Sequence, residues 1–236
     1  MSRYFIDCEF VEGTQAKKFL GFEYGRTKPT IDLISIGIVR EDGREYYAIS
    51  KDFNLDEAWN RYDLLEANTS KNHGMNGIKA YWLRDNVLKP IFAELDNLKR
   101  NSNSSVHLLP YTKCKKLLKK YGKSNKQIAE EIQAFVYHTG WEVDPPVHAH
   151  KLKEKGDIEF YAYFADYDWV AFCWLFGRMI DLPKGFPMFA FDIQQQIEEY
   201  KIDKELLLKE VPQINSHNAL ADARWNKKLY EFLKSL

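Results

Sequence analysis

The sequence has no long apolar run and no excess of charge of either sign. Its 236 residues include 34 basic and 34 acidic ones, so the protein has no overall field that would draw it to nucleic acid or to a membrane surface. The apolar stretches fall short of the roughly 20 residues that a membrane-spanning helix needs. The first residues also lack the basic-then-apolar pattern of a secretion signal. We therefore expect a cytoplasmic protein that has no membrane partner.

Cysteine is scarce, and the three cysteines form no CxxC motif of the kind that binds zinc or exchanges disulfides. Cys8 and Cys173 lie in apolar runs, where a core position is a simpler interpretation than a catalytic thiol, which needs a positioned base. No internal repeat and no clear linker divides the chain. We therefore expect one domain over residues 1–236.

One long segment has no acidic residue at all. Between Lys99 and Ala129 the sequence contains nine lysines and arginines and no Asp or Glu. These cations fit either the solvated face of a helix or a local phosphate-binding patch that the zero net charge conceals. In the second interpretation, Lys115 and Lys116 are candidates for contacts to the phosphates of a nucleic acid.

Strand patterns dominate the beginning of the sequence. Aromatic and β-branched residues predict strands over 4–10 and 31–40, and the Asp42-Gly43 turn predicts a hairpin into a third strand that ends at residue 50. The segment between the first two strands, 11–30, contains three glycines and four basic residues and is interpreted as a long loop.

Strands and helices alternate in the second half of the chain. A strand is predicted at 157–165 and a short apolar strand at 188–191, each followed by a helix, and an amphipathic helix closes the chain. Such alternation adds strands to a sheet through crossover helices. The sequence therefore predicts an α/β fold with a mixed five-stranded sheet, in which an antiparallel three-stranded meander is extended and helices cover both faces.

Two carboxylates lie side by side on the first predicted strand. Asp7 and Glu9 are two residues apart, so their side chains point the same way. Two neighbouring acids on a buried strand repel each other and lose hydration, and a bound cation relieves both costs. Carboxylate oxygens are the ligands that Mg²⁺ and Mn²⁺ prefer. The D-x-E pair alone is weak evidence for a metal site, because this pattern is common by chance.

The last helix supplies a second motif, H-x-A-x-x-D, formed by His217, Ala219 and Asp222. The carboxylate lies inside the helix, where it can reach a metal, and the histidine lies on the segment that leads into it. Ala219 and Ala221 are small enough to let this helix approach the sheet closely. A histidine in this place can take a proton from a reacting water near neutral pH.

A third group of acids, Asp166 and Asp168, lies where the strand at 157–165 gives way to the next helix. Acids at this place often cap a helix, which explains at least one of the two. The other is a candidate ligand of the same metal site. The residues alone leave open which acid has which role.

Together these motifs resemble those of the DEDDh 3′–5′ exonucleases, which have an RNase H-like fold. The order matches: D-x-E on the first strand, an aromatic-Asp pair at a mid-chain helix, and H-x-A-x-x-D near the C-terminus. The stretches IDLISIGIV, DGREYYAIS, YDWVAFCWLFG and HNALADAR resemble the small mycobacterial-type 3′–5′ exoribonucleases, and this similarity covers most of the chain. Relative to compact members, residues 11–30 and 99–123 look like insertions.

The resemblance implies a residue for each catalytic role and two divalent cations, Mg²⁺ or Mn²⁺, as cofactors. The implied reaction is two-metal hydrolysis of the phosphodiester at an RNA 3′ end, which releases 5′-mononucleotides. The metal ligands fall on Asp7, Glu9, Asp168 and Asp222, and the general base falls on His217.

Two of these assignments have alternatives. The third acid is assigned to Asp168 rather than to Asp166, because Tyr167 supplies the aromatic residue that directly precedes the Asp in the family's motif. Phe10, beside the first motif, either stacks on the terminal base as a substrate-binding residue or belongs to the core, and the two interpretations have equal weight.

The function also has alternatives at this point. A DNA exonuclease of the same family would use the same residues, since telling the two sugars apart needs only one contact to the 2′-hydroxyl. An inactive nuclease fold that only binds nucleic acid would be expected to lack an acid or the histidine, and all five residues are present. A homodimer is also left open, because related enzymes are often dimers.

Overall fold

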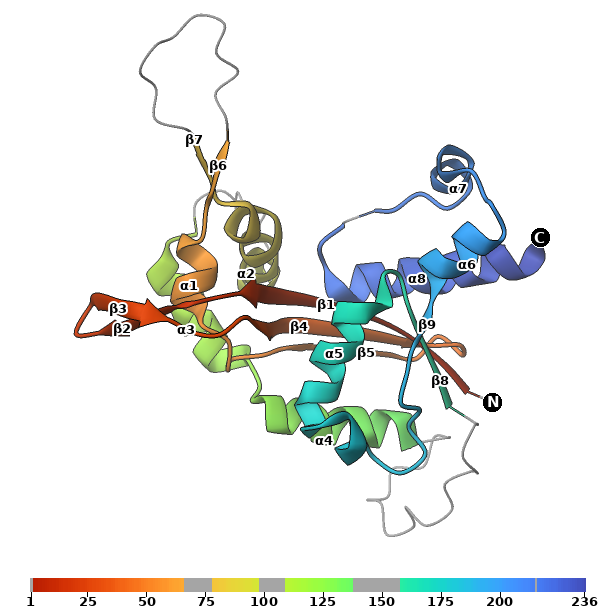
Figure 1. The fold of residues 1–236 in the computed structure, drawn as a ribbon, viewed down its shortest axis with the longest axis horizontal. Helices are drawn as coiled ribbons and strands as arrows, with labels where there is room; N and C mark the ends of the chain where they lie inside the picture. Colours follow the sequence, from red (N-terminus) through yellow and green to blue (C-terminus); the bar gives the residue numbers. More distant parts are fainter. Residues whose placement is uncertain (1, 66–77, 98–108, 138–157, 215) are drawn as a thin grey trace, which may run out of the picture. The chain divides into compact units, whose positions relative to one another are not determined.

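The computed structural model describes residues 2–65, 78–97, 109–137, 158–214 and 216–236 (Figure 1). The chain groups into two compact units. The first, which we call the sheet unit, comprises residues 1–12, 31–53 and 122–236, and the second unit comprises residues 13–30 and 54–121. The prediction of one exonuclease domain over the whole chain stays a prediction.

A mixed five-stranded sheet forms the centre of the sheet unit, in the order β5-β4-β1-β8-β9. β4 and β5 are antiparallel, whereas β1 pairs in parallel with β8, and β8 in parallel with β9. This confirms the predicted α/β class with five strands, and β1, β4 and β5 are neighbours as the predicted meander requires. The strands are β1 (Ser2–Gly13), β4 (Thr30–Arg40), β5 (Glu45–Ile49), β8 (Ile158–Ala162) and β9 (Phe191–Asp192).

Helices cover both faces of this sheet. One core packs α4 and α5 on the sheet, and a second core packs α6, α7 and α8 on it. A short 3₁₀ turn, Met179–Asp181, follows α5 after Gly177, whose φ of +115° ends the helix. The helices are α4 (Asn125–Tyr137), α5 (Ala165–Phe176), α6 (Ile193–Glu199), α7 (Lys204–Glu210) and α8 (Ala219–Ser235).

Alternation along β1 decides which face receives the two acids. Tyr4, Ile6 and Cys8 are buried in the core that contains α4 and α5, and this confirms the core position predicted for Cys8. Phe5 is buried in the other core, against α8. Successive strand side chains point to opposite faces, so Asp7 and Glu9 share the face of Phe5. The acids are therefore presented to the helix that carries the H-x-A-x-x-D motif.

The start of α8 lies very close to the sheet. A Cβ atom on Gly37 of β4 would overlap the backbone carbonyl of Ala219, so only glycine fits there. The buried Asn226 donates from Nδ2 to the carbonyl oxygen of Ile6 at 2.8 Å. Because Asn226 lies one helical turn after Asp222, this bond fixes the same face of α8 against β1.

The second unit corrects the prediction of a long loop over 11–30. Within this segment, β2 and β3 form an antiparallel hairpin with a turn at Leu20 and Gly21. The hairpin escaped prediction because Lys17, Lys18 and four exposed apolar residues show no alternation of buried and polar positions. The elements of this unit are β2 (Ala16–Phe19), β3 (Phe22–Arg26), α1 (Leu55–Asn60), β6 (Asp63–Leu65), β7 (Ile78–Ala80), a π-helical turn η1 (Arg84–Leu88), α2 (Lys89–Asn97) and α3 (Tyr111–Tyr121).

The structure also bears on the predictions about the cysteines and about membrane-spanning helices. Cys8, Cys114 and Cys173 are all free and buried, which agrees with the core positions predicted for the first and the last. Among the described residues, none of the helices has the length and apolar character to cross a membrane.

Candidate active site

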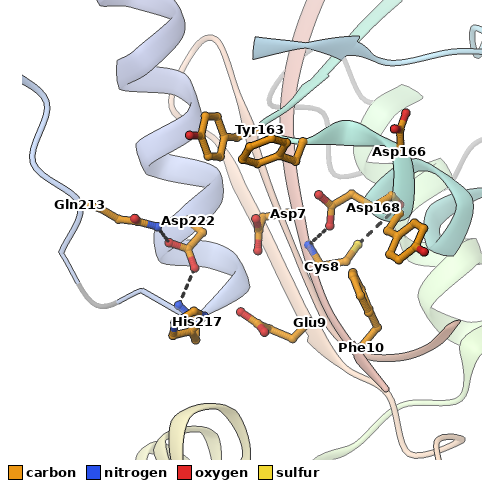
Figure 2. A pocket seen from close by; sticks show the side chains of 12 residues that line it. Asp7, Cys8, Glu9, Phe10, Tyr163, Asp166, Asp168, Gln213, His217 and Asp222 are labelled. Atoms are coloured by element: carbon orange, nitrogen blue, oxygen red, sulfur yellow. Dashed lines mark hydrogen bonds between the residues drawn. The ribbon is translucent and has the colours of Figure 1, made fainter. Parts of the chain in front are cut away.

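A pocket of about 430 Å³ in the sheet unit contains the predicted motif residues (Figure 2). This volume lies in the range of pockets that enclose small ligands, about 300–1,000 Å³. Three segments line the pocket: the middle of β1, the start of α5 with the residues before it, and the start of α8 with the residues before it. The first and last segments come from opposite ends of the chain, and only the fold brings them together.

The carboxylates of Asp7, Glu9 and Asp222 converge in this pocket. One oxygen from each of them lies within 4.8 Å of the others. Within the described residues, no side chain donates a hydrogen bond to Asp7 or Glu9, and neither forms an ion pair. Three carboxylates this close together, two of which accept no hydrogen bond from the described residues, suit a hard divalent cation, which prefers carboxylate ligands. The donor set therefore fits a metal ion of the Mg²⁺ or Mn²⁺ class.

The segment before α8 orients Asp222. The Nε2 atom of Gln213 donates to Oδ1 of Asp222 at 2.7 Å, and the backbone N–H of His217 donates to Oδ2 at 2.8 Å. Asn218 caps the helix by accepting from the N–H of Ala221. His217 adopts a left-handed backbone conformation, with φ of +68°, which is uncommon outside glycine but which histidine adopts more often than most residues. This conformation lets its N–H turn back to Asp222 while its side chain lines the pocket.

Asp168 extends from α5 toward the site, and a hydrogen bond to the backbone of β1 holds its carboxylate there. Its Oδ1 accepts from the backbone N–H of Cys8 at 2.8 Å. β8 pairs with β1 only as far as the Phe5–Tyr161 position, so the Cys8 N–H lies beyond the parallel ladder. Asp168 is thus buried, and Figure 2 shows its carboxylate turned toward Asp7.

Asp166 is placed differently from Asp168. It is exposed at the rim of the same pocket, and its carboxylate points away from Asp7 (Figure 2). The start of α5 is also unusual, since Phe164 before it has a φ of +55° and offers no side-chain cap. The resemblance assigned the third acid to Asp168, with Asp166 as the alternative; in the structure Asp168 is the buried acid beside Asp7, and its role stays a prediction.

Burial is the main cause that raises the pKa of every carboxyl group in the cluster. The pKa of Glu9 rises from 4.5 to about 8, and the charges of Asp222 and Asp168 add to the effect of burial. The pKa of Asp168 also rises to about 8, although the hydrogen bond from Cys8 opposes the shift. Burial, with the charges of the three other acids, raises the pKa of Asp7, and burial raises that of Asp222. Together these groups resist ionisation unless a cation is present.

The predicted substrate-binding residues are divided between the two units. Phe10 lines the pocket, where its ring meets that of Tyr167 edge to face at 5.9 Å, and it also packs against the core. The packing agrees with the core interpretation, and stacking of Phe10 on a terminal base stays a prediction. Lys115 and Lys116 are exposed on α3 in the second unit, and their contact with nucleic acid stays a prediction.

Sequence reasoning missed several residues that build the site. Gln213 carries no motif, and its bond to Asp222 depends on the path of the segment before α8. Tyr163 and Phe164 line the pocket but were interpreted only as the end of a strand. Asn226 offered a usable signal, because it is a polar residue on the apolar face of α8, one turn after the motif acid.

Comparison with known proteins gives two relatives of this chain. The 3′-5′ exoribonuclease Rv2179c of Mycobacterium tuberculosis strain H37Rv is 27% identical over 233 residues, which is 99% of this chain and 94% of that protein. The 3′-5′ exoribonuclease MT2234.1 of strain CDC 1551 gives the same values. No family model matches the chain. In sequence, the chain is thus similar to the mycobacterial type of 3′–5′ exoribonuclease over nearly its whole length.

Proposed function

We propose that this protein is a metal-dependent 3′–5′ exoribonuclease of the DEDDh type with an RNase H-like fold. One observation carries the proposal: the acids of two motifs from opposite ends of the chain converge within 4.8 Å, in a pocket that also contains Asp168 and His217. The similarity to two proteins named 3′-5′ exoribonuclease supports RNA as the polymer. All five residues that the resemblance requires lie in one pocket.

Each of these residues has a role in the proposed reaction. Divalent cations, when bound, neutralise charge on the phosphodiester and make water a stronger nucleophile. Asp7, Glu9, Asp168 and Asp222 would hold two such ions, Mg²⁺ or Mn²⁺, through carboxylate oxygens. The hydrogen bonds from Gln213 and from the His217 backbone keep Asp222 oriented.

The imidazole of His217 would take the proton of the attacking water. The left-handed backbone at this residue fixes where the ring enters the pocket, while the N–H is committed to Asp222. Cleavage of the bond to the leaving 3′-oxygen then releases a 5′-mononucleotide. Phe10, whose ring meets that of Tyr167, would contact the terminal base.

The activity is tested by incubating the protein with 5′-labelled RNA and DNA, single-stranded and with 3′ overhangs, in the presence of Mg²⁺ or Mn²⁺. The expected result is a ladder of RNA that shortens from the 3′ end and disappears with EDTA. Preferential shortening of DNA would support the DNA exonuclease instead. Binding of either polymer without shortening would show an inactive nuclease fold and contradict the proposal.

The choice between Asp168 and Asp166 is tested by alanine variants of each. Asp168→Ala removes a buried carboxylate that faces Asp7, so we expect a loss of at least about 100-fold in kcat/KM, or about 3 kcal/mol of transition-state stabilisation. Asp166→Ala removes an exposed carboxylate and should change kcat/KM less than about threefold. The opposite ranking of the two variants would mean that Asp166 is the third acid.

A further inference from the structure

The two units carry opposite formal charges that cancel in the whole chain. The second unit, residues 13–30 and 54–121, contains 16 basic and 8 acidic residues, which gives a formal charge of +8. The sheet unit contains 18 basic and 26 acidic residues, a formal charge of −8. A concentration of positive charge in one part of a chain is typical of a surface that binds a polyanion. The zero net charge of the chain conceals this concentration of positive charge.

The β2–β3 hairpin of this unit has an unusual tip. Leu20 and Gly21 have φ of +49° and +86°, as in the two-residue turns that connect tight hairpins. Asparagine or glycine normally occupies the first of these positions, because a left-handed backbone is strained for other residues. Here the position holds a leucine whose surface is 83% exposed. The tip therefore combines backbone strain with exposed apolar surface.

The two faces of the hairpin have different surroundings. Lys18 and Glu23 are paired across the strands, and the Nζ atom of Lys18 bonds Oδ2 of Asp56 on α1 at 2.6 Å. Phe19 and Phe22 form the next pair, and residues directly opposite in an antiparallel ladder share one face. Successive residues alternate between faces, so one face is fastened to α1 and the other presents two phenylalanines to solvent.

These phenylalanines belong to a patch of exposed aromatic rings with cations beside them. Phe19 and Phe22 are 70% and 79% exposed, and Tyr24, at a bulge in β3, is 69% exposed. Lys17 and Lys28 are exposed in the same segment. Large apolar side chains that are exposed together on one short hairpin indicate a contact surface. Flat rings flanked by lysines suit the bases and phosphates of a single-stranded nucleic acid.

We propose that the β2–β3 hairpin is a stacking surface for the bases of single-stranded RNA, which the positive charge of the second unit attracts. The choice of RNA rests on the proposed function, whereas the binding surface lies outside the catalytic pocket. Direct pairing of two hairpins is disfavoured, because it would bring two units of charge +8 together. A polyanion gains from the same charge and can offer a stacked base to each ring.

The test measures RNA binding apart from hydrolysis, by fluorescence anisotropy of a 5′-labelled single-stranded RNA in EDTA. The double variant Phe19→Ala/Phe22→Ala is expected to raise Kd about 10-fold or more, because each lost base–ring stack weakens binding. The salt dependence of Kd should stay unchanged, since no phosphate contact is lost. Lys17→Ala should instead reduce the slope of log Kd against log salt by about 0.7.

Two controls separate stacking from general damage. The double variant Phe19→Trp/Phe22→Trp keeps flat rings and should retain the affinity. Tyr200→Ala removes a ring that is 55% exposed in the sheet unit, and it should leave Kd unchanged. The melting temperatures of all variants should match that of the parent, because the substituted side chains are exposed.

An unchanged Kd in Phe19→Ala/Phe22→Ala would overturn the proposal. A change in sedimentation of this variant with no change in Kd would also overturn it, because the hairpin would then join two copies of the chain. If the parent protein binds RNA through the hairpin but fails to shorten it, the exoribonuclease function is contradicted while the stacking surface is supported. The two proposals can therefore fail separately.

Discussion

Replacing Asp7 by asparagine is expected to abolish RNA shortening and, at the same time, to stabilise the protein in the absence of metal. Asp7 lies in the middle of the acidic cluster, between the segments that carry Asp168 and Asp222 (Figure 2). The amide keeps the shape of the side chain but removes the negative charge that a cation needs. We expect kcat/KM to fall at least about 1,000-fold, or about 4 kcal/mol of transition-state stabilisation.

The gain in stability has the same origin as the loss of activity. In the absence of metal, burial and three neighbouring acids oppose the negative charge of Asp7 and raise its pKa. Removal of that charge should raise the free energy of unfolding by about 1–2 kcal/mol. For a chain of this length, this corresponds to a rise in Tm of about 2–8 °C.

Both effects can be measured on one preparation, with calorimetry in EDTA and a 3′-shortening assay in Mg²⁺. Asp63→Asn provides a matched control, because Asp63 is an exposed acid in the second unit. It should change neither Tm nor activity. A variant Asp7→Asn that retains more than about a tenth of the activity would contradict a role of Asp7 in metal binding.

Divalent cations are expected to raise Tm strongly, and by more at pH 8 than at pH 5. Without metal, folding raises the pKa of Glu9 from 4.5 to about 8 and that of Asp168 from 3.8 to about 8. Between pH 4 and pH 8 the folded protein therefore holds protons that the unfolded chain has released. Stability falls as the pH rises wherever the folded state binds more protons. The metal-free protein should thus be most stable near pH 4–5.

A bound cation opposes the loss of stability at high pH, because it binds the ionised carboxylates. At a free concentration about 100 times its Kd, a ligand that binds only the folded state adds about 2.7 kcal/mol, which raises Tm by about 5–11 °C for a chain of this length. The measurement is Tm from pH 5 to pH 8 in EDTA and in excess MgCl₂ or MnCl₂ at matched ionic strength. Glu9→Gln/Asp168→Asn should show a smaller pH slope and a smaller response to metal. A metal-free Tm that rises toward pH 8 would refute this account of the cluster.

The sequence by itself determined the local features of the site. The spacing of Asp7 and Glu9 places them on one face of β1, because strand side chains alternate whatever the rest of the fold does. The five-stranded α/β class also followed from local patterns, since strong strands and amphipathic helices alternate along the chain. The motif at the start of α8 identified Asp222 and His217 from a few neighbouring residues.

Contacts between distant residues could not be predicted in this way. Gly37 and Asn226 hold α8 against the sheet, but Gly37 shows no such role in its own segment, and the local sequence marks Asn226 as unusual without identifying its partner. Gln213 bonds Asp222 because of the path that the chain takes before α8. The β2–β3 hairpin has a leucine at the turn position where asparagine or glycine would be expected. A hydrogen bond from Lys18 to Asp56 on α1 holds one of its faces in place.

The distinction between Asp166 and Asp168 shows where sequence information ends. Both acids lie in the first turn of α5, and local rules allow either of them to cap the helix. Only tertiary structure buries Asp168, where it accepts from the N–H of Cys8, and leaves Asp166 exposed. Sequence determined which residues could bind a cation, because residue type and spacing are local properties. Tertiary structure decided which of them meet, because that depends on how the strands end and the helices pack.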